Sequence, residues 1–215
     1  MARMSPADRR EAIITATLQV MITKGLASTT VRDVAERMGT SSGLIHHYFA
    51  SMDDLLAAAF ERAAGEDLDG VRAAMAAGSG AVARLQIFFG KYTRADQDWA
   101  FQLWLDAWAE AARRPAVRAT SQRWNIAWQQ LLVEVIRVGV AEGALRCADP
   151  EAAGWRILSL LDGLALQAVV HRVAINRDDV VNWSAGYAET ELGLAAGTIR
   201  PHRSGRADLA PAPGE

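Results

Sequence analysis

The chain has 215 residues, of which 51% are hydrophobic, and a formal net charge of −2 at pH 7. Ala, Leu, Arg and Glu dominate while alternating strand patterns are missing, so we expect an all-α fold. The length allows a small domain plus a larger one, or a single all-helical unit of linked bundles. A single cysteine, Cys147, excludes an intramolecular disulfide and a multi-cysteine metal site, and without a signal peptide or long apolar run we expect a cytoplasmic protein with no membrane segment.

The charge is distributed unevenly along the chain. Residues 1–50 contain six basic and four acidic side chains, a balance of +2, which leaves −4 for the remainder. A modestly basic N-terminal segment on an acidic body fits contact with phosphate groups at one end only, although this small excess alone does not indicate DNA binding.

The first helix is predicted to begin after Ser5, which can cap a helix that has Pro6 at its first position, and to end at Gly25. Its apolar residues recur at helical spacing: Ile13, Ala16, Val20 and Met21. We expect this helix to pack across the next two and to close a three-helix core.

Two short helices joined by a tight turn are predicted over residues 30–49. Thr30 and Asp33 form a capping-box pair at the start of the first one, which Gly39 can end with a positive φ. Its apolar face consists of Val31, Val34, Ala35 and Met38. The hydroxyls of residues 40–42 then offer a cap to the second helix, residues 42–49. This pattern is typical of a helix-turn-helix, whose second helix is shaped to enter a DNA major groove.

Six further helices are predicted. Ser51 and Asp54 form a capping pair for a helix that runs to about Ala77, where Gly78-Ser79-Gly80 breaks it. Helical patterns then cover residues 81–93, 98–114, 115–142, 150–173 and 177–196. Residues 199–215, rich in Pro, Gly, Ala and Arg, are expected to form a disordered tail.

Three motifs carry a resemblance to a known family: Thr-Thr-Val-Arg-Asp-Val-Ala at residues 29–35, Gly-Thr-Ser-Ser-Gly at 39–43 and Ile-His-His-Tyr-Phe at 45–49. From Ile13 to Leu56 the chain resembles the DNA-binding region of TetR-family transcriptional regulators, which typically show these motifs with small variations. The last motif is nearest that of the choline-responsive, BetI-like branch, as is Leu-Asp-Gly-Leu at 161–164. Elsewhere the likeness is one of length and helical content.

The resemblance implies a helix-turn-helix DNA-binding domain over residues 1–50, a helical ligand-binding and dimerisation domain over residues 51–198, and the tail beyond. It implies that a double-stranded, palindromic DNA operator is contacted by Thr29, Thr30, Thr40, Ser41, Ser42, Gly43, His46, His47 and Tyr48. Thr29, Thr30 and Tyr48 would reach phosphates. The alternative is that the serines only cap the helix and that a histidine only packs.

The chain departs from the family pattern at Met52, where many members carry a lysine that grips a phosphate. That contact is either lost or replaced by one of three N-terminal arginines, Arg3, Arg9 or Arg10. Arginines that are merely solvated fit the sequence equally well.

The resemblance also implies a homodimer formed through the last two helices, by Leu161, Leu164, Ala168, Trp183 and Tyr187. The helix predicted over residues 150–173 is apolar on more than one side, so two of its faces must be covered. Burial within one chain is the alternative interpretation.

Seven tryptophans are many for a chain of this length, and six of them lie in the range from Trp99 to Trp155. Plain core packing is one interpretation of the aromatic stripes, and a ligand site between helices is the other, since large rings seldom fill a bundle without leaving space. We expect a small-molecule pocket lined by Phe101, Trp104, Asp106, Trp108, Trp128 and Asp162. The acids in it would favour a cationic effector.

These features predict a ligand-responsive transcriptional regulator, most simply a repressor that a small molecule releases from its operator. An activator, and a helical small-molecule carrier without DNA binding, are the alternatives. Against an enzyme, no Gly-rich phosphate loop, metalloprotease motif or nucleophile elbow occurs. His46 and His47 point about 100° apart as helix neighbours, and His171 and His202 are isolated, so neither a metal nor a cofactor is expected.

Overall fold

The structure, a computed structural model, describes residues 4–92, 98–171 and 174–200, and this part of the chain is built of helices, as the sequence predicted. The helices are α1 (Pro6–Lys24), α2 (Val31–Arg37), α3 (Ser42–Tyr48), α4 (Met52–Ala76), α5 (Ala81–Lys91), α6 (Asp98–Ala111), α7 (Pro115–Ala141), α8 (Pro150–Leu166), a π-helical turn (Gln167–His171) and α9 (Arg177–Glu191). The expected ends at residues 93 and 173 lie outside the described residues.

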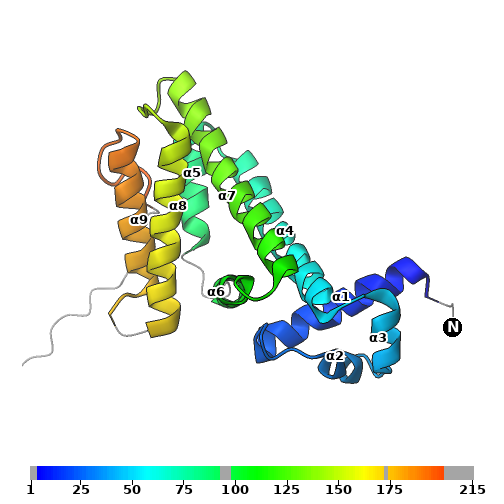
Figure 1. The fold of residues 1–215 in the computed structure, drawn as a ribbon. Coiled ribbons are helices and arrows are strands. Elements are labelled where there is room, and N and C mark those ends of the chain that lie inside the picture. Colours follow the sequence, from blue (N-terminus) through cyan, green and yellow to red (C-terminus); the bar gives the residue numbers. More distant parts are fainter. Residues whose placement is uncertain (1–3, 93–97, 172–173, 201–215) are drawn as a thin grey trace, which may run out of the picture.

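Helices α1, α2 and α3 form a small head at one end of the molecule, and α5, α8 and α9 lie at the other end (Figure 1). The two long helices α4 and α7 run side by side between these ends, while α6 lies across the junction. The rest of the molecule beyond the head is called the body below.

Side-chain caps define where the helices of the head begin, as predicted. The Ser5 hydroxyl accepts a hydrogen bond from the backbone N–H of Asp8 at 3.1 Å, and Ser51 does the same for Asp54 at the start of α4, also at 3.1 Å. Thr30 forms the complete capping box at α2. Gly25 ends α1 with a φ of 83°, a conformation that costs glycine little.

Two hydrophobic clusters fill the interior. The head cluster includes Ile13, Leu26, Val34, Ile45 and Phe60, together with Leu103, Ala107 and Val117 from α6 and α7. The body cluster is centred on Phe88, Phe89, Leu132, Ile157 and Leu161. Trp104 and Trp124 pack against both clusters. The sequence boundary expected at residue 50 therefore does not divide the interior, because α4 contributes to both clusters.

The packed chain continues past the expected boundary at residue 198. Ile199 is fully buried, and the buried carboxylate of Glu189 accepts hydrogen bonds from the N–H groups of Gly197 at 2.8 Å and Ile199 at 2.7 Å. The segment up to Arg200 thus belongs to the fold, and the rest of the expected tail, residues 201–215, lies outside the described residues.

Two helical glycines predict opposite responses to the same substitution. A Cβ added to Gly139 in α7 would lie 2.4 Å from Leu145 Cδ1, whereas a Cβ added to Gly70 in α4 meets nothing within 4 Å. We expect Gly139→Ala to lower the free energy of unfolding by about 1–3 kcal/mol through overpacking. Gly70→Ala should raise it by about 0.5–1 kcal/mol, because alanine loses less backbone entropy in a helix. Urea denaturation at one protein concentration measures both; the same sign for the two variants contradicts this packing.

Candidate functional site

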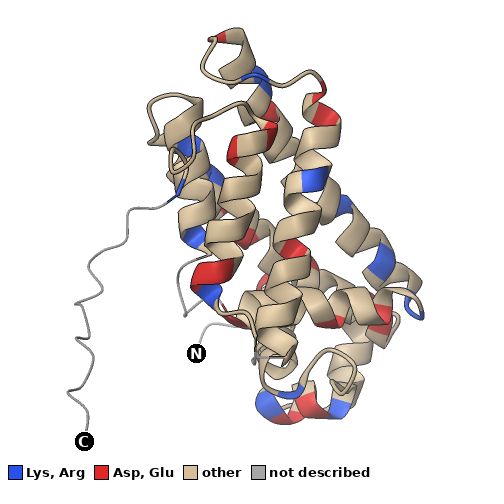
Figure 2. Ribbon diagram, turned by 90° about the vertical axis from the view of Figure 1, so that its left-hand side faces the viewer, with Lys and Arg blue, Asp and Glu red and all other residues tan. Residues whose placement is uncertain are grey.

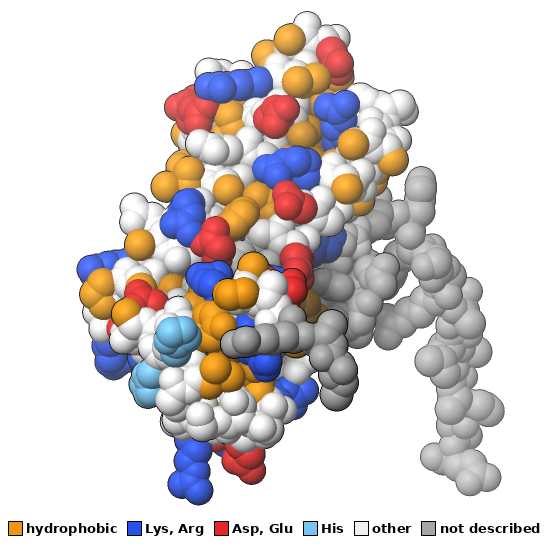
Figure 3. All heavy atoms as spheres, turned by 90° about the vertical axis from the view of Figure 1, so that its right-hand side faces the viewer, with side chains coloured by type: hydrophobic (Ala, Val, Ile, Leu, Met, Phe, Trp, Pro, Cys, Tyr) orange, Lys and Arg blue, Asp and Glu red, His pale blue; other side chains and the backbone are white. Residues whose placement is uncertain are grey.

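Helix α3 presents a polar surface because its apolar residues are anchored beneath it. Ile45 and Phe49 are 1% and 6% exposed and belong to the head cluster. The side chains left exposed are those of Ser41, Ser42, His46 and His47, with Gly43 between them. Figure 3 shows histidine side chains next to one another at the left of the head. Four of the side chains expected to meet a major groove are therefore exposed to solvent.

Three of the expected DNA-contacting residues have partners within the head. Ser41 caps α3 by accepting a hydrogen bond from Leu44 N–H at 3.4 Å, yet its side chain remains exposed. Tyr48 is half-buried, and its ring meets that of His47 edge-on with 5.2 Å between centroids. Thr40 is half-buried at the turn, where its N–H donates to the carbonyl of Ala35 at 2.9 Å. The capping interpretation of Ser41 is correct without excluding contact with DNA.

The structure contradicts the predicted phosphate contact of Thr29. This residue is only 3% exposed, and its hydroxyl donates to the carbonyl oxygen of Gly25 at 2.8 Å. Its N–H also donates within the chain, to the carbonyl of Leu26 at 3.3 Å. Both groups that could have bound a phosphate instead close the turn after α1, a use that the sequence motif did not reveal.

Thr30 remains exposed beside a charged carboxylate. Its hydroxyl and N–H both donate to Asp33 Oδ2, at 2.7 and 3.0 Å. Asp33 also forms an ion pair with Lys24. The hydrogen bond from Lys24, followed by those from Thr30, lowers the pKa of Asp33 to about 2. The N-terminus of α2 therefore already holds one anionic group within the head.

Arg10 lies near the corner between α3 and α4. Its guanidinium carbon lies 4.9 Å from the centroid of the Phe49 ring. Met52 at that corner is partly buried and packs against the head cluster. Arg9 is half-buried, and Arg3 lies outside the described residues.

Seen from the α9 side, charges of both signs are interspersed over the described chain (Figure 2).

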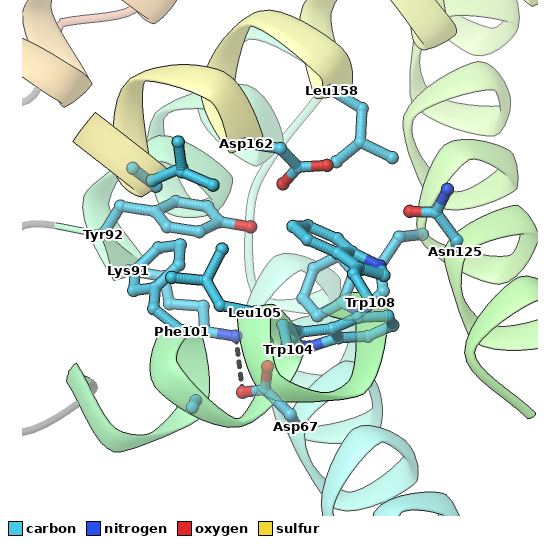
Figure 4. A pocket seen from close by; sticks show the side chains of 14 residues that line it. Asp67, Lys91, Tyr92, Phe101, Trp104, Leu105, Trp108, Asn125, Leu158 and Asp162 are labelled. Carbon is cyan, nitrogen blue, oxygen red and sulfur yellow. Dashed lines mark hydrogen bonds and ion pairs between the residues drawn. The ribbon is translucent and has the colours of Figure 1, made fainter. Parts of the chain in front are cut away.

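A cavity in the body lies between α4, α5, α6, α7 and α8 (Figure 4). Four of the predicted aromatic side chains and one predicted acid line it: Phe101, Trp104, Trp108, Trp128 and Asp162. The periodicity of α6 explains this, because Phe101, Trp104, Leu105 and Trp108 share one helix face. The open volume is about 40 Å³, so the side chains nearly fill the space in this conformation.

The structure contradicts the expected place of Asp106 in this cavity. Asp106 lies on another side of α6, where its Oδ2 accepts a hydrogen bond from the backbone N–H of Leu26 at 3.0 Å. Its other oxygen accepts from Gln102 Nε2 at 3.0 Å. The helix that lines the cavity is thereby joined to the loop between α1 and α2.

Four polar residues of the cavity were not predicted: Asp67, Lys91, Tyr92 and Asn125. Lys91 Nζ lies 2.5 Å from Asp67 Oδ1, 4.5 Å from the centroid of the Trp128 ring and 5.6 Å from that of Tyr92. Burial lowers the pKa of Lys91, and the Asp67 carboxylate opposes that shift. The only sequence signal was that Lys91 is one of just two lysines among the 23 basic residues.

Asp162 directs its carboxylate into the cavity from α8 (Figure 4). Burial raises the pKa of Asp162 to about 7. The pKa of the buried Tyr92 phenol is raised well above its ordinary value, first by burial and then by the negative charges of Asp162 and Asp67. When ionised, the two acids and Lys91 together leave one net negative charge in the cavity.

Trp128, which also lines the cavity, has an unsatisfied hydrogen-bond donor, because its indole N–H is buried without a hydrogen-bond partner among the described residues. The cavity thus combines aromatic ring faces with an excess of negative charge, which suits a cation. Among the described residues, no group of three or more His, Cys, Asp or Glu side chains could hold a metal ion.

Helix α9 and the π-helical turn after α8 each leave an apolar side chain exposed. Trp183 is 51% exposed and Val170 is 54% exposed. Leu164, Ala168 and Tyr187, which were predicted at a dimer interface, are half-buried. Leu161 was predicted there too, but the structure contradicts this, because Leu161 is fully buried in the body cluster.

The stretch Pro150–His171 is long and apolar enough to span a membrane, with a mean hydropathy of 1.3, although this test rests on length and composition only. A core helix of a soluble protein passes the same test, and 33% of the 18-residue window that was tested is buried.

Comparison with known proteins matches both parts of the chain. A sequence model of bacterial regulatory proteins of the tetR family matches residues 13–59, and a model of the C-terminal domain of BetI-type transcriptional repressors matches residues 81–193. The HTH-type transcriptional regulator BetI of Rhizobium meliloti strain 1021 is 29% identical over 191 residues, covering 86% of this chain and 89% of that protein.

Two solved structures share the fold. A putative transcriptional regulator from Pseudomonas aeruginosa PAO1 has a TM-score of 0.74 and 27% identity, covering 87% of this chain and 92% of that one. A putative transcriptional regulator from Saccharomonospora viridis, solved in complex with choline, has a TM-score of 0.78 and 23% identity, covering 86% of this chain and 98% of that one.

Asp162 predicts a pH-dependent stability. Its pKa in the folded protein, about 7, exceeds the ordinary value of 3.8, so the folded state binds the proton more tightly than the unfolded state. Its contribution to stability is fully present below pH 3.8 and is lost as the pH rises through 7. Asp162→Asn should raise the free energy of unfolding by about 1–3 kcal/mol at pH 8, by less than half of that at pH 5, and by little only below pH 3.8.

Urea unfolding at a series of pH values measures this effect. Asp69→Asn, a change at an exposed carboxylate on α4, is the matched control and should show no comparable trend. An equal difference between Asp162→Asn and the parent at pH 5 and pH 8 would contradict the burial of a titrating carboxyl group.

Proposed function

Since the chain belongs to the tetR family of bacterial regulatory proteins, with a C-terminal domain of the BetI type, we propose that it is a dimeric repressor that a small organic cation releases from DNA. Its class is that of a helix-turn-helix transcriptional regulator. Repression, the dimer and the charge of the effector are the proposed parts. The observation that carries the effector class is the aromatic cavity lined by two acids, Asp67 and Asp162, and one ammonium group, that of Lys91.

The head supports DNA recognition through α3. Its exposed residues are small or polar, and none is an acid that would repel phosphate. We infer that Ser42, His46 and His47 face base edges while Thr30, Tyr48 and Arg10 face the backbone. The remaining predicted contacts, Thr40, Ser41 and Gly43, surround the start of α3.

A dimer follows from the uncovered apolar face of α8 and α9. Covering Trp183 and Val170 by a second copy would pair the same helices of two protomers into a four-helix arrangement. Two heads related by a two-fold axis would meet successive major grooves about 34 Å apart, which requires a palindromic operator. The protein would act in the cytoplasm, where the DNA is.

The effector is inferred to be a monovalent organic cation. One such charge would neutralise the cavity, pair with the Asp162 carboxylate and lie against the rings of Trp104 and Trp108. The choline bound by the regulator from Saccharomonospora viridis supports this class, since choline is a quaternary ammonium. The buried indole N–H of Trp128 would donate to a hydroxyl on such a molecule.

Helix α6 offers the route from cavity to head. Trp104 lines the cavity and meets Phe60 of the head cluster edge-on, with 4.9 Å between ring centroids. On the same helix, Asp106 holds Leu26 N–H. Beyond it, Arg114 binds Asp53 of α4 at 2.5 Å. An effector that fits better when the heads are spread would shift the population away from DNA, by no more than its difference in affinity for the two states.

Two alternative functions have less support. A carrier without a DNA role would not need the exposed α3 surface, and the relatives are named as transcriptional regulators rather than enzymes. Activation rather than repression fits the same fold. The BetI-type model is described as one of transcriptional repressors, which favours repression.

DNA binding can be tested on two residues of α3. His47→Ala should weaken binding to DNA from upstream of the chain's own gene by about 5- to 100-fold, since one base contact contributes about 1–3 kcal/mol of discrimination. Tyr48→Ala should weaken specific and nonspecific binding alike. Gel shifts at fixed salt measure both, with Gln130→Ala on the exposed face of α7 as the control. Unchanged binding by both variants would remove α3 from the interface.

Effector binding can be tested with choline and tetramethylammonium. Both should quench the tryptophan fluorescence and release the DNA, whereas Asp162→Asn should reduce their affinity by about tenfold or more because a charged partner is lost. Affinity for the parent should rise between pH 6 and pH 8 as Asp162 ionises, since its pKa is about 7. If flat apolar compounds bind instead and both cations are inert, the effector class is wrong.

A substitution at Asp106 should distinguish effector binding from the release of DNA. Asp106→Ala removes the bond to Leu26 without altering the cavity lining, so the cations should still quench the tryptophans while releasing DNA less completely. Combining fluorescence titration with gel shifts on one protein preparation distinguishes the two steps. Parallel loss of quenching and release would indicate that Asp106 supports the cavity and not the coupling to the head.

A further inference from the structure

Lys91 is unusual in this chain both by type and by place. It is one of two lysines among 23 basic residues, and its side chain is only 15% exposed. A buried lysine is costly unless it is paired, and a compact ammonium differs from the guanidinium that the chain uses almost everywhere else. Position 91 therefore carries a compact, buried positive charge, unlike the other basic positions of the chain.

The ammonium group of Lys91 occupies part of the aromatic cavity described above, here called the cage. Nζ lies 4.5 Å from the centroid of the Trp128 ring and is held by Asp67 at 2.5 Å. Figure 4 shows the carboxylates of Asp67 and Asp162 on opposite sides of the clustered side chains, with Lys91 next to Asp67. One acid of the cavity is thus neutralised from within the chain, and Asp162 is left for a ligand.

The same ion pair also borders an open groove on the outside. Asp67 and Lys91 line the inner cavity and, together with Glu66 and Trp99, a groove of about 640 Å³ between α4 and α5. Because both spaces touch the same two side chains, the Asp67–Lys91 pair forms the wall between them. Removing the lysine side chain would join the spaces and uncover a second carboxylate.

We propose that Lys91 is a specificity-determining residue, whose tethered ammonium fills the half of the cage beside Asp67 and restricts the cavity to ligands with a single cationic group. The inference rests on the proposed cationic effector and deepens it. A diamine would need a carboxylate at each end, and in the parent protein Lys91 already holds one of the two. A monocation needs only Asp162, which forms no ion pair with any of the described residues.

The experiment compares monocations with diamines by fluorescence titration and calorimetry. The probes are choline and tetramethylammonium on one side, and putrescine, cadaverine and hexamethylenediamine on the other. The parent should prefer the monocations. Lys91→Met should improve the affinity of the best diamine relative to tetramethylammonium by at least about tenfold, because a second charge-assisted pair becomes available.

A double variant separates the freed carboxylate from the loss of the ammonium. Lys91→Met with Asp67→Asn removes the ammonium without freeing a carboxylate, so it should keep the parent's preference for monocations. Lys24→Met removes the only other lysine, on the head, and should leave the preference unchanged. Circular dichroism and size-exclusion chromatography establish that each variant is folded before it is titrated.

The outcomes are distinguishable from failure of the proposed effector class. An unchanged ratio of diamine to monocation affinity in Lys91→Met overturns the role of Lys91, as does a parent that binds both kinds equally, although the cationic class would survive. If the parent binds no cation and Lys91→Met binds diamines, the role of Lys91 in specificity is supported and the proposed monovalent effector is wrong. If neither the parent nor the variant binds any cation, the role of Lys91 and the proposed effector class are both overturned.

Discussion

The packing of Trp104 between two hydrophobic clusters is the interaction on which the rest of the structure depends. One side of this residue lines the cavity, and its ring also meets Phe60 in the head cluster. Protein interiors are close-packed and transmit strain, so a displacement of this ring cannot be absorbed within the cavity alone. The head and the cavity are thereby parts of one interior, which α4 and α6 both span.

The polar groups of the cavity explain why its interior is not simply apolar. Burying Lys91, Asp67 and Asp162 opposes folding, and only the first two compensate each other. An apolar core of the same volume would be more stable, so a carboxylate whose pKa is raised to about 7 indicates a site kept for another purpose. Stability and ligand recognition therefore make opposite demands on the same residues.

Local features were predictable from the sequence, and features that depend on which side of a helix faces inward were not. Capping by Ser5, Thr30 and Ser51 depends on residues three apart, so the helix starts could be predicted. The stripe on α6 predicted the aromatic wall. Spacing alone could not show that Asp106 turns to the head or that Lys91 and Asp67 approach from α5 and α4, because only tertiary packing brings these helices together.

Helix α8 joins the cavity to an exposed apolar surface. It contributes Leu158 and Asp162 to the cavity and leaves Trp155 39% exposed, and in the π-helical turn that follows it Val170 is 54% exposed. If α8 moves as a rigid unit, a ligand that contacts its inner face also acts on the outer one. If a second copy covers that outer face, each cavity is connected to the partner protomer as directly as α6 connects it to the head. The spacing of the two heads would then depend on both cavities at once.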